Sequence, residues 1–221
     1  MLEERIVEVK RKLIAYSAFV QAMIEKSIRG LLEREKPLLL EVVEKDEPQA
    51  NSYEMELDDL CAYTIAKFQP RARDLRTILV GLRMSNDLER MADHAVNIAE
   101  SGLFLVERPA VKELIDIPRM AQEATGMVRD ALLSFLNEDA KLAREVCRRD
   151  SVVDALKDQI LRELITYMSA DPGTIERSMN LLTISNNLER IADFSTNISE
   201  DVIFMVEGRI IKHHRENNSE S

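Results

Sequence analysis

The feature that most constrains the fold of this 221-residue chain is a segment that occurs twice. The sequences SNDLERMADHAVNIAE at 85–100 and SNNLERIADFSTNISE at 185–200 are identical at 10 of 16 positions and align without a gap. Self-similarity of this kind is the signature of a repeated structural unit. The sequence therefore predicts two similar halves, and any fold assigned to one half must also suit the other.

The repeat extends upstream of the matched segment. Residues 46–63 align with 150–167 at a shift of 104, which pairs Leu57 with Leu161. Apolar residues recur at steps of three and four through both regions, which is the spacing of one buried face of an α-helix. Each half is therefore expected to contain at least two helices within the repeated part.

Breaks in this apolar pattern divide the chain into six helices. They fall near residues 37, 70, 109, 138 and 172, mostly at prolines, which a helix interior does not tolerate. The first helix is expected over 2–35, and the second lies between Pro37 and Pro70. The chain has only 6 Gly and 6 Pro, which argues against a turn-rich sandwich or barrel.

We therefore predict an all-α fold of two tandem antiparallel three-helix bundles. The first bundle spans 1–106, the second spans 119–208, and a connection with two prolines joins them at 107–118. Residues 209–221 are polar and are expected to form a disordered tail.

Charge and hydropathy restrict the partners and the location of the protein. A formal net charge of −10 repels phosphate backbones, which argues against a nucleic-acid partner. No apolar run approaches the roughly 18 residues that a membrane span needs. The two cysteines, Cys61 and Cys147, lie far apart in apolar stretches and are interpreted as core residues. We expect a cytoplasmic protein without a membrane span.

Each repeated segment carries two carboxylates four residues apart, a spacing that places both on one helix face. The first pair is Glu89 and Asp93, and the second is Glu189 and Asp193. One such pair is weak evidence for a site, because acidic residues are common in this chain and usually face solvent. Their recurrence in the repeat makes them candidates for a shared function.

Counting residues from the turn near 172 places two more acids opposite the second pair. Asp150 and Asp154 precede the turn by about as many residues as Asp193 and Glu189 follow it. Antiparallel helices would bring these four carboxylates to one level, where like charges are costly unless a cation neutralises them. Oxygen donors favour Mg, Ca, Mn or ferric iron. The second half is therefore expected to bind metal.

The first half offers a weaker version of this set. Asp46 stands at the level of Asp93, but position 50, which would face Glu89, is Ala. Amide side chains four residues beyond each repeated aspartate add weaker oxygen donors: Asn97 and Asn197. We expect the first site to bind metal less completely than the second.

Two other interpretations of the acids remain open. They form solvated outer stripes balanced by Arg90 and Arg190, or they belong to a carboxylate-bridged metal-storage or redox bundle. A di-iron oxidase of that type calls for Glu-x-x-His on two helices, and the chain lacks this motif. His94 is replaced by Phe194 in the repeat, and no phosphate-binding loop or nucleophile elbow occurs. No catalytic set is expected.

The motifs LERMAD and LERIAD, with acids on the preceding helix, resemble those of the PhoU family of phosphate-uptake regulators. The similarity covers nearly the whole chain and includes the FQPRARDLR turn near 70 and the repeated N-I-x-E endings. The resemblance implies a cytoplasmic, all-helical and often dimeric protein that is not an enzyme. Such a protein damps phosphate-starvation signalling between the ATPase of a phosphate ABC transporter and a phosphate-sensing histidine kinase.

The resemblance also implies multinuclear metal clusters at paired E(D)xxxD motifs. In this chain the matching pairs are Glu89 and Asp93, Glu189 and Asp193, and Asp150 and Asp154. Ala50 departs from the pattern in the first half. The identity of the metal is left open among iron, Mg, Mn, Ca and Zn.

Overall fold

The computed structural model describes residues 1–208, and this part of the chain is helical, with no β-strand in it. Seven α-helices occur within these residues, together with one π-helical and one 3-10 turn: α1 Leu2–Leu32, α2 Lys36–Glu41, η1 Val42–Asp46, α3 Glu47–Phe68, α4 Ala72–Val106, α5 Asp116–Asn137, α6 Ala140–Ala170, η2 Pro172–Thr174 and α7 Ile175–Glu207. The predicted all-α class is confirmed.

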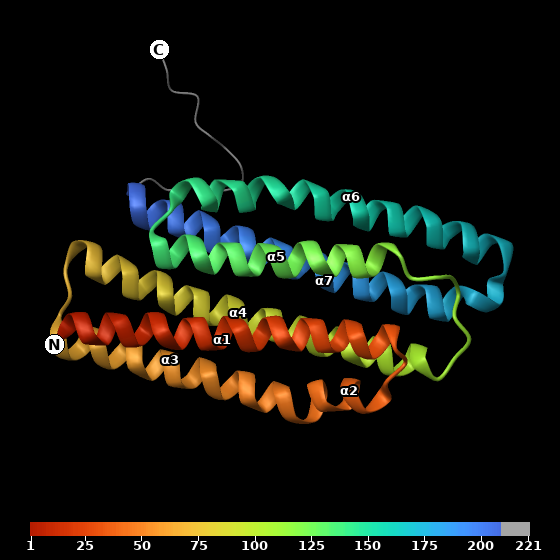
Figure 1. Cartoon of the computed structure of the whole chain (residues 1–221), viewed down its shortest axis with the longest axis horizontal. Helices are drawn as coiled ribbons and strands as arrows, with labels where there is room; N and C mark the ends of the chain where they lie inside the picture. Colours follow the sequence, from red (N-terminus) through yellow and green to blue (C-terminus); the bar gives the residue numbers. More distant parts are fainter. Residues whose placement is uncertain (209–221) are drawn as a thin grey trace, which may run out of the picture.

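The helices form two three-helix bundles that lie side by side along their length (Figure 1). Helices α1, α3 and α4 pack together in the first bundle, and α5, α6 and α7 pack together in the second. Helix α4 packs along α7, and α1 packs along α5, so the bundles share a long seam. Helices α3 and α6 lie at opposite edges of the molecule (Figure 1). The predicted pair of tandem three-helix bundles is confirmed.

The core is continuous across this seam, because the apolar stripes of the long helices face one another. In α1 the side chains of Leu13, Tyr16 and Val20 are fully buried, as their three- and four-residue spacing predicts. Ile78 and Leu88 of α4 are buried to the same degree. Each such aliphatic side chain contributes about 1.5 to 3 kcal/mol to stability. Aliphatic seams therefore hold the two bundles together.

Left-handed backbone residues and a side-chain cap mark several helix ends. Gln69, directly after α3, has a φ of 45°, and Ala72 at the start of α4 has a φ of 48°, so this turn holds two non-glycine residues in the left-handed region. The Asp139 carboxylate accepts hydrogen bonds from the backbone N–H groups two and three residues later, at 2.9 and 3.0 Å. Gly208 closes α7 with a φ of 70°. Asp139 thus caps the N-terminus of α6.

The second expected helix is interrupted. Instead of one helix between Pro37 and Pro70, α2 ends at Glu41 and a π-helical turn at Val42–Asp46 leads into α3. The corresponding helix of the second half, α6, is α-helical along its whole length. A π-helical turn accommodates one more residue than an α-helical turn. The two halves are therefore expected to differ in register beyond this turn.

Burial shows that difference. At the predicted shift of 104, the fully buried Leu57 corresponds to Leu161, which is 39% exposed. The predicted alignment is therefore wrong by one position on α3. A shift of 103 pairs buried residues with buried residues: Ala50 with Val153, Leu57 with Ile160, and Cys61 with Leu164.

The connection between the bundles is shorter than the segment assigned to it. Helix α4 ends at Val106 and α5 begins at Asp116, so the last residues of the predicted connection at 107–118 are already helical. None of the helices within residues 1–208 is long and apolar enough to cross a membrane. The polar tail predicted at 209–221 lies outside the described residues.

Candidate functional site

In the second half, the acids of the repeat lie next to cations. Lys157 Nζ of α6 is 2.9 Å from Glu189 Oε1 of α7, and Arg190 Nη1 is 3.2 Å from Asp193 Oδ2. Burial raises the pKa of Asp193, Glu189 and Asp154 raise it further, and Arg190 lowers it. Side chains of the chain itself thus partly neutralise these carboxylates.

Asp150, another predicted site residue of α6, lies close to Cys147. Burial raises the pKa of the Cys147 thiol to about 11, and Glu200 and Asp150 raise it further. Cys147 Sγ lies 4.0 Å from the Thr196 carbonyl oxygen to which it donates, which fixes the level of α6 against α7. Asp150 follows Cys147 by three residues, and Asp193 precedes Thr196 by three. Because α6 and α7 are antiparallel, Asp150 and Asp193 therefore lie at one level. We call Asp150, Asp154, Glu189 and Asp193 the second-half acidic cluster.

In the first half, four carboxylates of α3 and α4 form no ion pair with another residue of the described part of the chain. We call Glu54 and Asp58 of α3, with Glu89 and Asp93 of α4, the first-half acidic cluster. Burial raises the pKa of Glu54 and of Glu89, and the neighbouring carboxylates raise each further. Burial also raises the pKa of Asp58. None of the four makes an ion pair with a described residue, although Arg90 lowers the pKa of Glu89.

Tyr16 of α1 lies on the core side of the first-half acidic cluster. Its side chain is 0% exposed, and its hydroxyl has no hydrogen-bond partner among the described residues. Burial raises the pKa of Tyr16, and all four carboxylates of the cluster raise it further. Asp58 Oδ1 is likewise buried without a partner in the described structure. Two buried oxygen atoms at this cluster are therefore unsatisfied.

Asp46, predicted to belong to the first-half set, has a partner of its own. Its Oδ2 atom is 2.7 Å from Lys26 Nζ, and Glu41 Oε1 lies 3.1 Å from the same ammonium group. Asp46 ends the π-helical turn and is 8% exposed. Its charge is compensated by α1, and Glu54 and Asp58 are the α3 acids that act on Glu89 or Tyr16.

The remaining predicted polar residues lie outside the two clusters. Asn97 and Asn197, the weaker donors, are exposed one helical turn beyond the repeated aspartates. His94 Nδ1 lies 2.6 Å from Asn187 Oδ1, and the His94 ring stacks on Phe194 with the centroids 5.6 Å apart. His94 therefore belongs to the α4–α7 seam.

The donor chemistry of the first-half acidic cluster fits a hard cation. Within residues 1–208, no three His, Cys, Asp or Glu side chains converge closely enough to hold a metal ion as they stand. Carboxylates repel one another, so bringing these four acids together would need a cation to neutralise their charge. Oxygen atoms are the ligands that hard cations prefer. The two orphaned oxygen atoms, Asp58 Oδ1 and Tyr16 Oη, are buried polar groups that such a cation would satisfy.

Sequence reasoning missed two acids of this cluster and the neighbouring Tyr16. Glu54 and Asp58 have the same four-residue spacing as Glu89 and Asp93, so the sequence contained a signal for them. Counting from the turn near 70 favoured Asp46, because it precedes that turn by about as many residues as Asp93 follows it. Tyr16 fits the apolar stripe of the first helix, and nothing in that pattern distinguishes it from a core residue.

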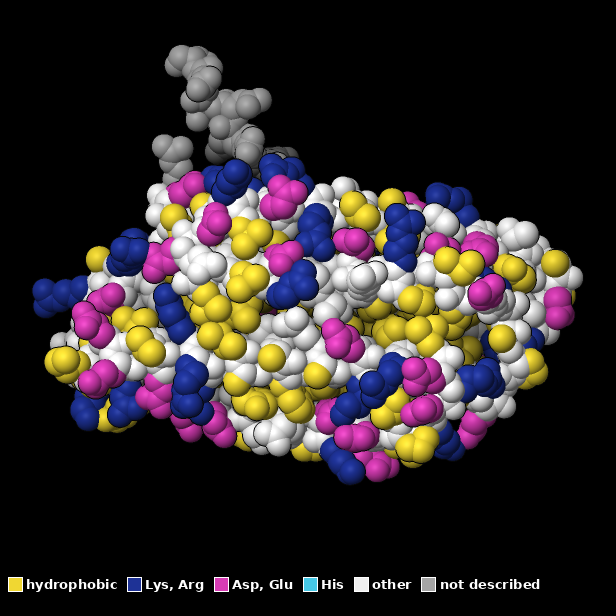
Figure 2. Space-filling model, viewed as in Figure 1, with side chains coloured by type: hydrophobic (Ala, Val, Ile, Leu, Met, Phe, Trp, Pro, Cys, Tyr) yellow, Lys and Arg dark blue, Asp and Glu magenta, His cyan; other side chains and the backbone are white. Residues whose placement is uncertain are grey.

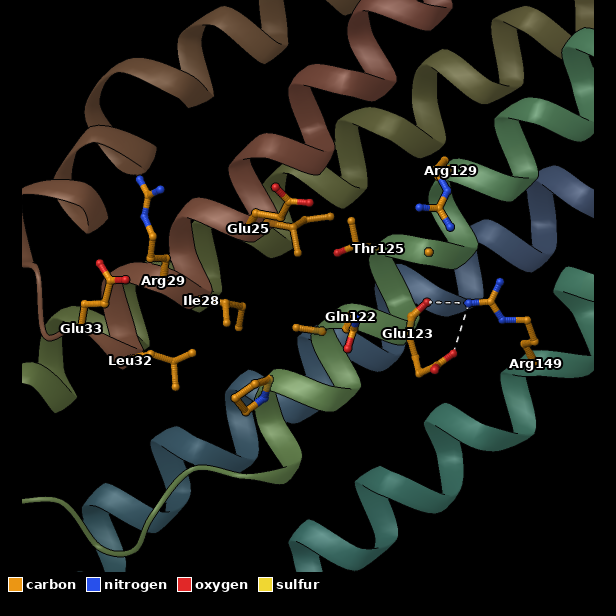
Figure 3. Close-up of a pocket in the computed structure, with 14 residues that line it drawn as sticks. Glu25, Ile28, Arg29, Leu32, Glu33, Gln122, Glu123, Thr125, Arg129 and Arg149 are labelled. Carbon is orange, nitrogen blue, oxygen red and sulfur yellow. Dashed lines mark hydrogen bonds and ion pairs between the residues drawn. The ribbon is translucent and has the colours of Figure 1, made fainter.

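A separate groove of about 650 Å³ lies between α1 and α5, where the two bundles diverge. Figure 2 shows hydrophobic side chains in a hollow along this seam and charges of both signs over the rest of the face. Arg149 Nη2 lies 3.1 Å from Glu123 Oε2 at the edge of the groove (Figure 3), and its Nη1 lies 2.7 Å from Asp130 Oδ2. A Cβ atom at Gly126 would lie 2.8 Å from the same guanidinium group, so the glycine makes room for it. Arg149 is thus engaged in holding α6 to α5.

Comparison with known proteins gives consistent matches along the chain. The profile of the PhoU domain matches residues 13–102 and 117–202, one copy in each half. The chain is 35% identical over 212 residues to "Phosphate-specific transport system accessory protein PhoU homolog 2" of Thermotoga maritima, which covers 96% of this chain and 90% of the relative. It is 37% identical over 212 residues to a PhoU homolog of Aquifex aeolicus, with 96% of both proteins covered.

Solved structures agree with these matches. The crystal structure of PhoU from Pseudomonas aeruginosa superposes with a TM-score of 0.90 at 31% identity, and covers 95% of this chain and 100% of that one. The PhoU structure from Streptococcus pneumoniae, at 22% identity, superposes with a TM-score of 0.88 over 96% of this chain and 100% of that one. At that identity the second likeness supports the fold alone.

Proposed function

This chain belongs to the PhoU family, as its sequence resemblance indicated, and on that premise we propose that it restrains phosphate uptake and the phosphate-starvation response. The observation that carries the proposal is the pair of PhoU domains, one in each half, together with relatives that match nearly the full length of the chain. Those relatives are named accessory proteins of the phosphate-specific transport system. This kinship supports a regulatory, non-enzymatic role.

The proposed mechanism is contact with other proteins. In it, the two-bundle body docks on the ATPase of a phosphate ABC transporter and on a phosphate-sensing histidine kinase, in the cytoplasm and as a homodimer. The rigidity of long helices packed along a shared seam supports a role as a docking body. The formal net charge of −10 supports protein partners over nucleic acid.

We further propose that metal ions contribute to this role. The residues that would hold them are the two acidic clusters: Glu54, Asp58, Glu89 and Asp93 in the first half, and Asp150, Asp154, Glu189 and Asp193 in the second. A bound cation would neutralise the carboxylates and fix the outer helix of each bundle against its neighbour. Because Lys157 and Arg190 already compensate the second cluster, the ion pairs favour the first cluster as the stronger site. That order is the reverse of the order expected from Ala50.

Gene deletion tests the regulatory role. Deleting the gene is expected to raise phosphate-regulated transcription in phosphate-rich medium, and restoring it should return transcription to the repressed level. Pulldown from phosphate-replete cells should recover the transporter ATPase or the kinase. Unchanged repression after deletion would contradict the proposal, and oxidase turnover by the metal-loaded protein would favour the redox-bundle alternative.

Carboxylate variants then separate the metal from the scaffold. A gene that encodes Glu89→Gln with Asp93→Asn should fail to restore repression if docking needs the metal. If it restores repression fully, the helical scaffold alone carries the regulation. The matched control is Glu3→Gln with Glu8→Gln, which removes two charges from the first turns of α1.

A further inference from the structure

Helix α1 carries a second stripe of side chains on the face opposite the core. In the view of Figure 1 the helix runs across the front of the molecule, between α5 and α3. Three large apolar side chains are exposed on this face: Val7 by 66%, Ile14 by 45% and Leu32 by 42%. We call the nine exposed residues that recur there at steps of three and four the outer stripe: Glu4, Val7, Arg11, Ile14, Ala18, Ala22, Glu25, Arg29 and Leu32. Within residues 1–208, nothing covers this stripe.

The spacing of the outer stripe is the same when it is read from either end. Its steps are 3, 4, 3, 4, 4, 3, 4 and 3, with Ala18 at the centre. A two-fold interface needs a surface that is complementary to itself. If a second α1 lies antiparallel across the stripe with the axis at Ala18, every stripe residue stands opposite another stripe residue. Ile14 of each copy then faces Ala22 of the other, a large side chain against a small one.

The charges of the outer stripe are complementary in the same arrangement. Arg11 and Glu25 stand seven residues on either side of Ala18, so the arginine of each copy faces the glutamate of the other. Neither residue makes an ion pair with another residue of the described chain. Two equivalent pairs would thus form, one on each side of an apolar centre. An apolar centre with a charged rim is the usual order of a protein interface.

Helix α5 extends this surface without adding net charge. It runs antiparallel beside α1 (Figure 1), and Lys10 Nζ lies 3.7 Å from Glu138 Oε1 near its end. Leu133, five residues before Glu138, is exposed on the same side. Arg129 Nε lies 3.2 Å from Asp130 Oδ1, so these two charges compensate each other. At 1.5 Å per residue and about 10 Å of width, the two helices offer on the order of 800 Å² per copy, the size of a stable interface.

We propose that the chain forms a homodimer through this face, with α1 packed antiparallel on α1 of a second copy about an axis at Ala18. The inference rests on the proposed function, which includes a homodimer, and assigns its interface. Helix α4 packs on the buried side of α1, so its exposed Arg90 and Asp93 stay on the far side of each copy. The dimer therefore presents its motif helices on two opposite sides, where it can hold two partners at once.

The first test uses the full-length protein in the presence of a chelator, so that metal does not influence assembly. Sedimentation velocity measures the mass and the dissociation constant of the dimer. Wild type should be a dimer. Ala18→Arg places two cations at the axis and should weaken the dimer at least about tenfold. Ala155→Arg is the matched control, because Ala155 is an exposed alanine of α6, and it should leave the dissociation constant unchanged.

A charge exchange tests the predicted pairing and keeps the test independent of folding defects. Arg11→Glu and Glu25→Arg each put like charges opposite one another at two places, and each should weaken the dimer at least about tenfold. The variant with both substitutions restores opposite charges and should dimerise within about threefold of wild type. Circular dichroism should show the helical content of wild type in all of these variants.

The outcomes separate this inference from the proposed function. A dimer that persists in Ala18→Arg, or one that the double exchange fails to restore, uses another surface; this overturns the inference and leaves the proposed homodimer standing. A wild type that is monomeric at every concentration overturns both, and the gene deletion then decides the regulatory role on its own. A chain that dimerises only after removal of residues 209–221 would have its stripe covered by its own C-terminal segment, which also overturns the inference.

Discussion

The two halves of the molecule carry the same Leu-Glu-Arg-x-Ala-Asp motif on equivalent helices, α4 and α7, yet its carboxylates have different neighbours. In the second half, Glu189 is paired with Lys157 and Asp193 with Arg190. In the first half, Glu89 and Asp93 lie near two further carboxylates and an orphaned phenol, with no ion pair to a described residue. The motif alone therefore does not determine how strongly a site attracts a cation.

The difference arises on the outer helices rather than in the motif. One π-helical turn in the first half shifts α3 by a residue relative to α6. The acids of the two helices also stand at different positions, because Glu54 corresponds to Lys157 and Asp58 to Leu161 at the shift of 103. In the second half the side chain of Lys157 partly neutralises these acids, whereas in the first half we propose that a bound cation does so. The two halves thus share the spacing of their core residues and differ in their charges.

The largest expected effect tests the register on which this comparison depends. Leu57→Ala and Ile160→Ala should each lower the free energy of unfolding by about 2 to 5 kcal/mol, because both side chains are fully buried. Leu161→Ala is the matched control and should cost less than about 1 kcal/mol, because Leu161 is 39% exposed. Urea denaturation measures all three. A loss at Leu161 as large as that at Leu57 would restore the shift of 104.

A smaller effect is expected at the seam between the halves, where the repeat places Asp87 opposite Asn187 in the alignment. Asn187 Oδ1 lies 2.6 Å from His94 Nδ1. In the repeat, Phe194 takes the place of His94, so Asp87 has no such hydrogen-bonding ring at the equivalent position. Burial raises the pKa of Asp87 to about 7, Asp201 raises it, and Arg90 and Arg83 lower it. The folded protein thus keeps a proton that the unfolded chain has lost.

This retained proton gives stability a definite dependence on pH. Because the folded state binds more protons than the unfolded state between about pH 4 and 7, stability should fall as the pH rises through this range. Asp87→Asn, which makes the first half like the second, should remove that slope and stabilise the protein by about 1 to 3 kcal/mol at pH 8. Denaturation curves at pH 5 and pH 8 check it. Equal slopes in wild type and variant would show that Asp87 ionises normally in the fold.

The smallest effect concerns two equivalent glutamates, Glu89 and Glu189, whose replacement should change the free energy of unfolding in opposite directions. In the metal-free protein at pH 8, Glu89→Gln should stabilise by up to about 1 kcal/mol, because it relieves repulsion among half-buried carboxylates. Glu189→Gln should destabilise by a similar amount, because it breaks the ion pair with Lys157. Both are measured by urea denaturation with a chelator present. Two effects of the same sign would mean that the halves do not differ in charge balance.

Much of the fold was predictable from the sequence, because helix spacing and proline positions are local signals. The bundle order, the Asp139 cap and the burial of Leu13, Tyr16 and Val20 all follow from such signals. The π-helical turn was not predictable, because residues 42–46 continue an ordinary helical pattern. The error in register on α3 follows from that turn.

The spacing of the repeat identified its acids, but it did not identify the cations that neutralise them. Whether Lys157 reaches Glu189 depends on how α6 rotates against α7, and only tertiary packing fixes that rotation. The same holds for Tyr16. It differs from an ordinary core tyrosine only because its hydroxyl has no hydrogen-bond partner among the described residues. Long-range charge balance is therefore the part of the site that a single sequence does not contain.

The metal content of two matched double variants tests most directly whether the first-half acids bind metal more strongly than the second-half acids. Glu89→Gln with Asp93→Asn removes the first-half motif charges, and Glu189→Gln with Asp193→Asn removes those of the second half while preserving side-chain shape. Each protein is loaded with the same metal, separated by gel filtration and analysed for metal per chain. The first-half variant is expected to lose the larger share of the bound metal. Equal losses, a larger loss in the second-half variant, or wild-type content in both would contradict it.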